Sequence, residues 1–205
     1  MNGWELGLLF AAWLAAVAFL RAYRVWLPYY VLGVAGFAYW LALSVHAIPS
    51  AELLLTHSVA FVVHVTSNAV GLPTRMFEGA PGTLLVLIVT QDVGWTVLRV
   101  GVESSALLEM SVLVSLLLFY PGWSHRWRVQ AIALGLLATW IGNVVRMLVV
   151  VAALHWLGKN ALLLAHTVVS KVFFFGLTIG IYWYLLTLPT LRDVRHLLQR
   201  RQFAS

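Results

Sequence analysis

Three residues that could act together in nucleophilic and acid–base chemistry stand inside otherwise apolar stretches. Ser104 comes just before the apolar run of "ESSALLEM", Arg146 lies in "GNVVRM", and His166 lies in "LLLAHTVVSK". A hydroxyl can act as a nucleophile, an imidazole can move a proton near neutral pH, and a guanidinium stays charged. Ionisable groups within apolar segments are costly to bury, so they mark a candidate functional site.

Each of the three also has an ordinary structural interpretation. Arg146 could extend to lipid phosphates, His166 could be a hydrogen-bonded histidine between helices, and Ser104 could cap a helix. Their predicted depth favours a shared site. Arg146 lies about 27 Å along its helix from Arg128, near the outer boundary of the apolar core, because an α-helix rises 1.5 Å per residue. Ser104 and His166 stand at or near the outer ends of two other predicted helices, 105–120 and 161–188, so all three residues are expected at one level.

The composition is that of an integral membrane protein. The 205 residues have a mean hydropathy of +0.91, and 10% are charged, against about 25% in soluble domains. The net charge of +6 lies in short clusters beside apolar runs, which is typical of topology signals and argues against nucleic acid as a partner. The absence of cysteine excludes disulfides, zinc–thiolate sites and a thiol nucleophile in this chain. We therefore expect one domain, 1–205, embedded in the lipid bilayer.

The apolar segments predict an all-α polytopic bundle of about five to six transmembrane helices. Crossing the hydrocarbon core takes about 20 residues. Five segments meet or approach that length: 4–20, 28–47, 105–120, 129–157 and 161–188. The segment 51–72 is long enough but polar, with His57, His64 and Asn68 on one helical face. It is expected to lie partly in the outer membrane or against the bundle, a full crossing being the alternative.

The region before the third helix predicts a small extracytoplasmic β-hairpin. Residues 73–82, "PTRMFEGAPG", form a turn-rich linker, and 83–104 contain two β-branched runs joined by "QDVG". Alternation in the second strand places Arg99 and Glu103 on its polar face, leading to Ser104. Strand backbone cannot face lipid unpaired, so the hairpin must lie at the surface or pack on protein.

Basic residues set the predicted orientation in the plasma membrane. Arg21 and Arg24, then the stretch "SHRWR" (124–128), then "RDVRHLLQRR" (192–201), mark three cytoplasmic segments. Five crossings then place the amino terminus and the candidate site on the outer face and the carboxy terminus in the cytoplasm.

A structural ion pair is predicted below the site. Glu109 lies five residues after Ser104, and Lys171 lies five residues after His166. Both helices are expected to run inward from one level, which puts the two charges at matching depth. Pairing is the usual solution for buried charges, so Glu109 and Lys171 are expected to tie the third and last helices together.

The order of these motifs resembles the exosortase/archaeosortase family of membrane-embedded sorting enzymes, over about residues 80–188. In that alignment Ser104 stands at the catalytic cysteine position, followed by Ser105 and the small residue Ala106. Asn143 and Arg146 match an Asn-x-x-Arg motif, and His166 matches the third motif. The resemblance implies a transpeptidase without metal or cofactor. Its implied partner is a membrane-anchored protein whose carboxy-terminal sorting signal comprises a short motif, a transmembrane helix and a basic tail.

The resemblance also implies roles for the matched residues. Residue 104 would attack the scissile carbonyl, His166 would transfer protons, and Arg146 would stabilise the thiolate or oxyanion. Asn143 would orient Arg146 or bind substrate backbone. Arg99 and Glu103 would hold the substrate motif or pair with each other.

Serine at position 104 leaves three interpretations. Replacement of the cysteine by serine would give an inactive form, and this is the interpretation we favour. A serine enzyme with His166 as its general base is the second, and a natural non-catalytic binder is the third.

Other functions have less support in the sequence. A transporter or channel subunit could use His57, His64 and Glu109, but no inverted repeat or pair of broken helices is present. An unrelated intramembrane serine protease lacks a G-x-S-x-G motif around Ser104. The seven histidines form no recognised metal-ligand spacing.

Overall fold

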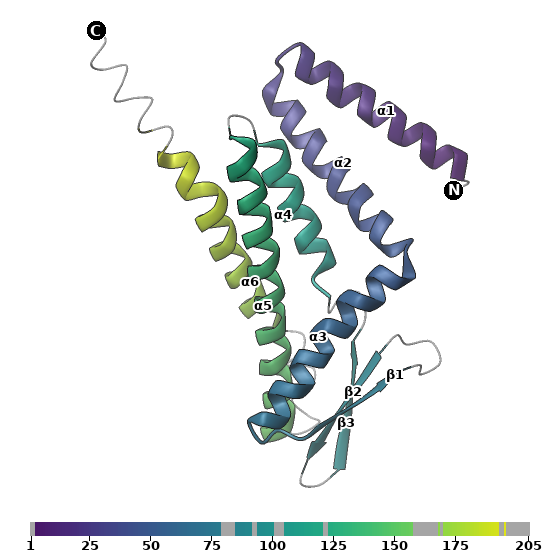
Figure 1. The fold of residues 1–205 in the computed structure, drawn as a ribbon, viewed down its shortest axis with the longest axis vertical. Coiled ribbons are helices and arrows are strands. Elements are labelled where there is room, and N and C mark those ends of the chain that lie inside the picture. The colour runs from purple at the N-terminus through teal and green to yellow at the C-terminus, as the bar shows by residue number, and fades with distance from the viewer. Residues whose placement is uncertain are drawn as a thin grey trace.

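The protein is described from a computed structural model that covers residues 3–78, 85–91, 94–100, 105–120, 123–157, 168, 170–192 and 195. Helices dominate it, and a small sheet stands at one end (Figure 1). The elements in chain order are α1 (Gly3–Ala22), α2 (Trp26–His46), α3 (Pro49–Ala69), β1 (Thr74–Glu78), β2 (Leu85–Gln91), β3 (Gly94–Val100), α4 (Leu107–Phe119), α5 (His125–Leu157) and α6 (Ser170–Tyr182). A π-helical turn, Trp183–Thr187, continues α6, and the helical span as a whole is Ser170–Arg192, whose last residues are called the end of α6 below.

Among the described residues, four helices are long and apolar enough to cross a membrane: Trp4–Ala22, Trp26–Val45, His125–Leu157 and Ser170–Arg192. The predicted helical membrane protein is confirmed at this level, but the predicted five crossings are not. Helix α4 has only 13 residues. At 1.5 Å per residue it spans about 20 Å, short of the roughly 30 Å hydrocarbon core. Ser105, Ala106 and Leu107 are all buried, so α4 begins inside the bundle.

Helices α1 and α2 form a lipid-facing arm on the bundle. Helix α1 is apolar on all sides, and only 6% of its span is buried, which suits a helix surrounded by lipid. The Trp13 Nε1–H donates to the Leu32 carbonyl oxygen at 2.9 Å, and the same indole covers Gly36. On α2, the lack of a side chain at Gly33 leaves room for the ring of Phe119 from α4.

Helix α5 is the central element of the bundle. Helix α4 packs between α2 and α5, and α6 packs along the other side of α5 (Figure 1). Gly135 permits this approach, because an added Cβ would stand 2.6 Å from Leu113 Cδ2 and 2.9 Å from Leu185 Cδ1. Small residues at helix contacts are typical of membrane bundles, where close packing replaces the hydrophobic effect as the driving force.

The strands form one antiparallel sheet in the order β1–β2–β3, with Met76 opposite Leu87 and Leu87 opposite Leu98. The segment predicted as a turn-rich linker contains strand β1. The prediction was wrong here because most turn-forming residues of this segment follow Glu78. The preceding residues, "TRMFE", pair with β2.

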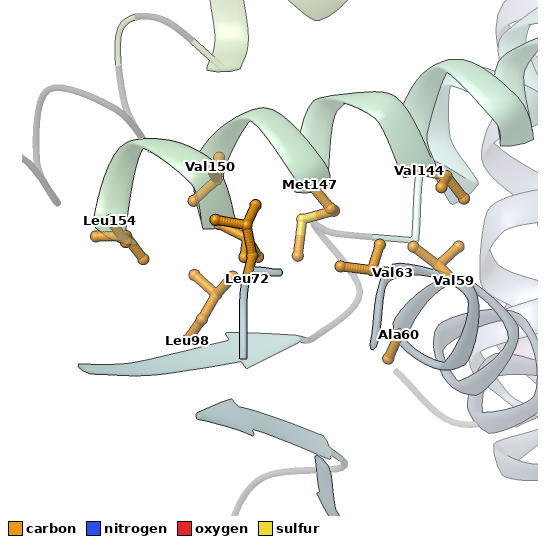
Figure 2. Packing of buried hydrophobic residues seen from close by; sticks show 10 residues of the cluster. Val59, Ala60, Val63, Leu72, Leu98, Val144, Met147, Val150 and Leu154 are labelled. Atoms are coloured by element: carbon orange, nitrogen blue, oxygen red, sulfur yellow. The ribbon is translucent and has the colours of Figure 1, made fainter. Parts of the chain in front are cut away.

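The sheet, α3 and the last part of α5 share a hydrophobic core. Figure 2 shows Val59 and Val63 of α3, Leu98 of β3 and Met147 of α5 converging there. Polar groups close the junction of α3 and β1. Thr74 is buried, its N–H donates to Asn68 Oδ1 at 3.1 Å, and its hydroxyl lies 2.9 Å from His64 Nδ1. The segment 51–72 thus packs against the bundle, and its polar face holds the sheet.

The loop between α1 and α2, the start of α5 and the end of α6 lie at the end of the molecule opposite the sheet (Figure 1). The Tyr30 hydroxyl donates to the Leu116 carbonyl oxygen at 3.3 Å, which aligns the start of α2 with the end of α4. An Arg128 Nη2–H donates to the Tyr120 carbonyl oxygen at 3.0 Å. Trp123 and Leu186 both pack against the buried cluster of Leu113, Leu117 and Ala131. The loop after α1, the start of α5 and the end of α6 therefore share one end, which we call the basic end.

Candidate functional site

The middle of α5 carries the two polar residues that the sequence singles out there. Asn143 is fully buried and Arg146 is 7% exposed. They are three residues apart, so they lie on neighbouring positions of one helical face. Val144, Met147 and Val150 surround them with buried apolar side chains. An arginine in such surroundings keeps its charge, so α5 places a permanent cation inside the protein.

An aromatic ring of α6 faces this cation. The Cζ atom of Arg146 lies 4.8 Å from the centroid of the Phe174 ring, and Phe174 is buried. A guanidinium over a ring face is attracted by the ring quadrupole, by about 2 kcal/mol or more when desolvated. The contact also links α5 to α6. Phe174 was not predicted as part of the site, because one phenylalanine in an apolar segment gives no signal before the helix register is known.

The start of α4 supplies a third buried polar residue. Ser105 is fully buried, and its Oγ accepts a hydrogen bond from the Leu107 N–H at 3.3 Å. Ala106 is also buried and adopts a left-handed conformation, with φ +57°. Such a conformation costs an alanine roughly 1 kcal/mol or more. The turn into α4 is therefore held by its surroundings, which fixes where residue 105 lies.

The packing of α4 on α5 brings Ser105 to the level of Asn143. Arg128 bonds to Tyr120, Ala131 packs in the cluster of Leu117, and Gly135 adjoins Leu113. The two helices are therefore antiparallel: a residue that lies further along α5 contacts a residue that lies about equally far back along α4. Continuing the same register pairs residue 143 with residue 105. Three of the predicted site residues, Ser105, Asn143 and Arg146, are buried at adjacent levels of the bundle.

Electrostatics at this level favour a bound or developing negative charge. The amino terminus of a helix carries a partial positive charge, equivalent to about half an elementary charge. By the register above, the first residue of α4, Leu107, lies opposite residue 141, which is about 7.5 Å along α5 from Arg146, and both Leu107 and Arg146 are buried. Two positive elements so placed can stabilise a thiolate, an oxyanion or a carboxylate.

Several predicted residues cannot be placed in this geometry. Ser104, Glu103 and His166 lie outside the described residues. Arg99 is in β3, opposite Val86 in the register, and only its backbone is described. The nearest described neighbour of Ser104 is Ser105, and α6 begins at Ser170, four residues after His166.

The predicted Glu109–Lys171 ion pair is wrong. The Tyr182 hydroxyl donates to the backbone carbonyl of Glu109 at 3.4 Å, which puts Glu109 eleven residues along α6 from Lys171. That separation is about 16 Å along the helix axis, and the Lys171 side chain is exposed. The prediction assumed that both helices start at one depth. Helix α4 begins deeper in the bundle, so equal counts from the two starts do not give equal depths.

Within the described residues, no group of three or more His, Asp or Glu side chains could hold a metal ion. The histidines of α3 have other contacts: His64 belongs to the Thr74 junction, and His57 stacks on Phe61 with ring centroids 6.3 Å apart.

Comparisons with known proteins give no relative for this chain: no family model, no curated protein and no solved structure matches it.

Proposed function

We propose that this chain is a membrane-embedded sorting peptidase of the exosortase/archaeosortase kind, built for a cysteine at position 104 and inactive with serine there. The observation that carries the proposal is the burial of Arg146 and Asn143 at the level where α4 begins. A cation that only extended to lipid phosphates would lie at the surface of the bundle. A buried cation beside a helix amino terminus suits chemistry that develops negative charge.

The position of residue 104 supports its role as the nucleophile. It immediately precedes Ser105 and the amino terminus of α4, where a thiol is more easily ionised, and the guanidinium of Arg146 adds to the same effect. A serine hydroxyl is not ionised by such a field and needs a general base during attack. A serine-dependent hydrolase with His166 as base is the alternative that the same experiments distinguish.

The proposed reaction proceeds through an acyl-enzyme. In the active form, a cysteine thiolate at position 104 would attack the scissile carbonyl carbon, and the tetrahedral oxyanion would lie beside Arg146. Cleavage of the C–N bond forms a thioester and releases the downstream segment as an amine, which takes its proton from His166. The acceptor nucleophile then gives a proton to His166 and attacks the thioester, which restores the thiolate.

The proposed orientation follows the distribution of charge. We place the basic end in the cytoplasm, with the carboxy terminus, and the sheet on the outer face of the plasma membrane. The substrate's transmembrane helix would then lie beside the bundle, with its cleavage motif at the level of the sheet.

Activity measurements test the proposal directly. Ser104→Cys should restore cleavage of a co-expressed membrane protein that ends in a sorting signal, and Ser104→Cys with Arg146→Ala should lose at least 100-fold in rate, about the value of one oxyanion-stabilising group. His166→Ala should abolish cleavage as well. Arg126→Ala, an exposed arginine at the far end of the same helix, is the matched control and should keep full activity.

Two outcomes would refute these roles. Full activity of the Arg146→Ala or His166→Ala variant would remove the assigned residue from the mechanism. Cleavage by the unaltered serine protein at a rate equal to that of Ser104→Cys would favour the serine-dependent alternative.

A further inference from the structure

The basic end of the molecule contains a pocket of about 500 Å³ between the start of α5 and the end of α6. Its walls are mainly aromatic and apolar, and they include one cation and two hydroxyl groups. The lining includes Trp123, Ser124, Trp127, Tyr184, Leu188 and Arg192. None of these residues belongs to the candidate catalytic site, which lies more than four helical turns away along α5.

The polar groups of the pocket suit an anion. Arg192 contributes a permanent positive charge, and Ser124 stands at the amino terminus of α5, where its Oγ accepts from the Trp127 N–H at 3.4 Å. The amino terminus of a helix carries a partial positive charge that attracts anions. Helix α5 has 33 residues, which is long enough for this charge to be fully developed. The Trp123 ring contributes apolar wall to the pocket, and Ser124 and Arg192 supply polar groups for an anion.

The sequence segments that contribute residues to the pocket carry mainly one sign of charge. Between Trp123 and Arg128, and again between Pro189 and Arg201, the sequence holds six arginines and one acidic residue, Asp193. A basic peptide is therefore excluded as the occupant, and an anion is attracted.

The apolar surroundings favour a lipid over a free anion. Trp127 is 43% exposed, Tyr184 is 72% exposed and Leu191 is 53% exposed. Trp127 belongs to the span His125–Leu157, and Tyr184 and Leu191 belong to the span Ser170–Arg192. Both spans are long and apolar enough to cross the membrane. Tryptophan and tyrosine are enriched at the level of lipid headgroups. Acyl chains could lie on these exposed side chains while a phosphate occupies the pocket, and a free phosphate ion would leave the apolar wall unused.

We propose that this pocket binds the phosphate headgroup of an anionic phospholipid from the leaflet that surrounds the basic end. The lipid bridges the amino terminus of α5 and the end of α6. Arg192 pairs with the phosphate, and the rings of Trp127 and Tyr184 flank the headgroup. This site is independent of the peptidase function.

Native mass spectrometry of the detergent-purified protein tests the proposal. The protein is titrated with phosphatidylglycerol and, separately, with phosphatidylcholine of the same acyl chains. Phosphatidylglycerol should bind more tightly. Arg192→Gln should weaken its binding about fivefold, the effect of one cation at an anionic membrane surface. Trp127→Ala should weaken it as well, although it leaves the charge unchanged. Arg195→Gln, the same loss of charge three residues away and outside the pocket lining, should bind like the unaltered protein.

Other results would overturn the proposal. Equal weakening by Arg192→Gln and Arg195→Gln would indicate a diffuse attraction by the basic end. Equal affinity for the two lipids would remove the anionic headgroup as the ligand. Displacement of phosphatidylglycerol by inorganic phosphate, with equal thermal stabilisation of the protein by phosphate alone, would indicate a site for a free anion. If Trp127→Ala fails to fold, the exposed Arg192 still carries the test, because its substitution removes no buried contact.

Discussion

Arg146 is a charged side chain that the fold surrounds with apolar groups, and its contacts indicate how that charge is tolerated. The Phe174 ring covers one face of the guanidinium at 4.8 Å from the ring centroid. Phe174 comes from α6, whereas Arg146 comes from α5, so the contact links two helices. The same contact holds the cation at the level of Ser105 and Asn143.

Replacement of Phe174 by leucine should weaken this link. A double-mutant cycle of Phe174→Leu with Arg146→Met should give a coupling energy of about 0.5–2 kcal/mol, the range for a cation over an aromatic face. Unfolding in detergent, followed by circular dichroism, measures it. Phe175→Leu is the control, because Phe175 is the next residue of α6 and is 66% exposed. A coupling energy near zero for Phe174, equal to that of the control, would show that the ring does not hold the guanidinium.

Polar site residues within apolar stretches could be predicted from the sequence, and the groups around them could not. Asn143, Arg146 and Ser105 are conspicuous in such stretches, and the structure buries all three. Phe174 resembles its apolar neighbours until the packing of α6 on α5 is known. The Glu109–Lys171 pair was wrong for a related reason, since a depth counted along one helix depends on where that helix starts.

Helix α4 shows how an element's length determines what it positions. Its 13 residues are too few to cross the membrane. Ala106 and Leu107 at its start are buried, so the amino terminus of α4 lies within the protein. The long apolar helices could be predicted from composition. The premature start of α4 could not, because residues 105 and 106 are as compatible with a helix as those that follow, and only the left-handed turn at Ala106 breaks it.

The contact of α4 and α6 on α5 depends on the absence of a side chain at Gly135. Gly135→Leu should lower the free energy of unfolding by about 1–3 kcal/mol, because the added group would overlap Leu113 and Leu185 from two different helices. Thermal unfolding in detergent measures the change. Gly180→Leu, on α6, is the matched control and should be near neutral, since no atom lies within 4 Å of a Cβ there. Equal melting temperatures for the two variants would contradict the proposed packing.

At the scale of the whole molecule, charge and architecture divide the protein into two ends. The basic end joins the loop after α1, the start of α5 and the end of α6, and the other end carries the sheet (Figure 1). This separation agrees with the three basic stretches that the sequence assigns to one side. The sheet was harder to predict. Strand β1 comes just before the Gly- and Pro-rich residues 79–82, and its partner β2 comes after them, so β1 was included in the predicted linker.

The absence of cysteine makes the orientation straightforward to test. In intact cells, a membrane-impermeant thiol reagent should label Val70→Cys, at the sheet end, and should label His125→Cys, at the basic end, only after lysis. Both positions are exposed, and the unaltered protein provides a thiol-free background. The opposite pattern would invert the proposed orientation and place the candidate site in the cytoplasm.

The most direct test of the central claim is the pKa of a thiol at position 104. The rate at which Ser104→Cys reacts with a thiol probe is followed against pH in detergent, with and without Arg146→Met. We expect labelling to persist well below the ordinary thiol pKa of about 8.5, and Arg146→Met to shift the profile towards that value. A profile with an ordinary pKa that does not change with Arg146→Met would contradict the account, because the buried cation would then have no influence on residue 104.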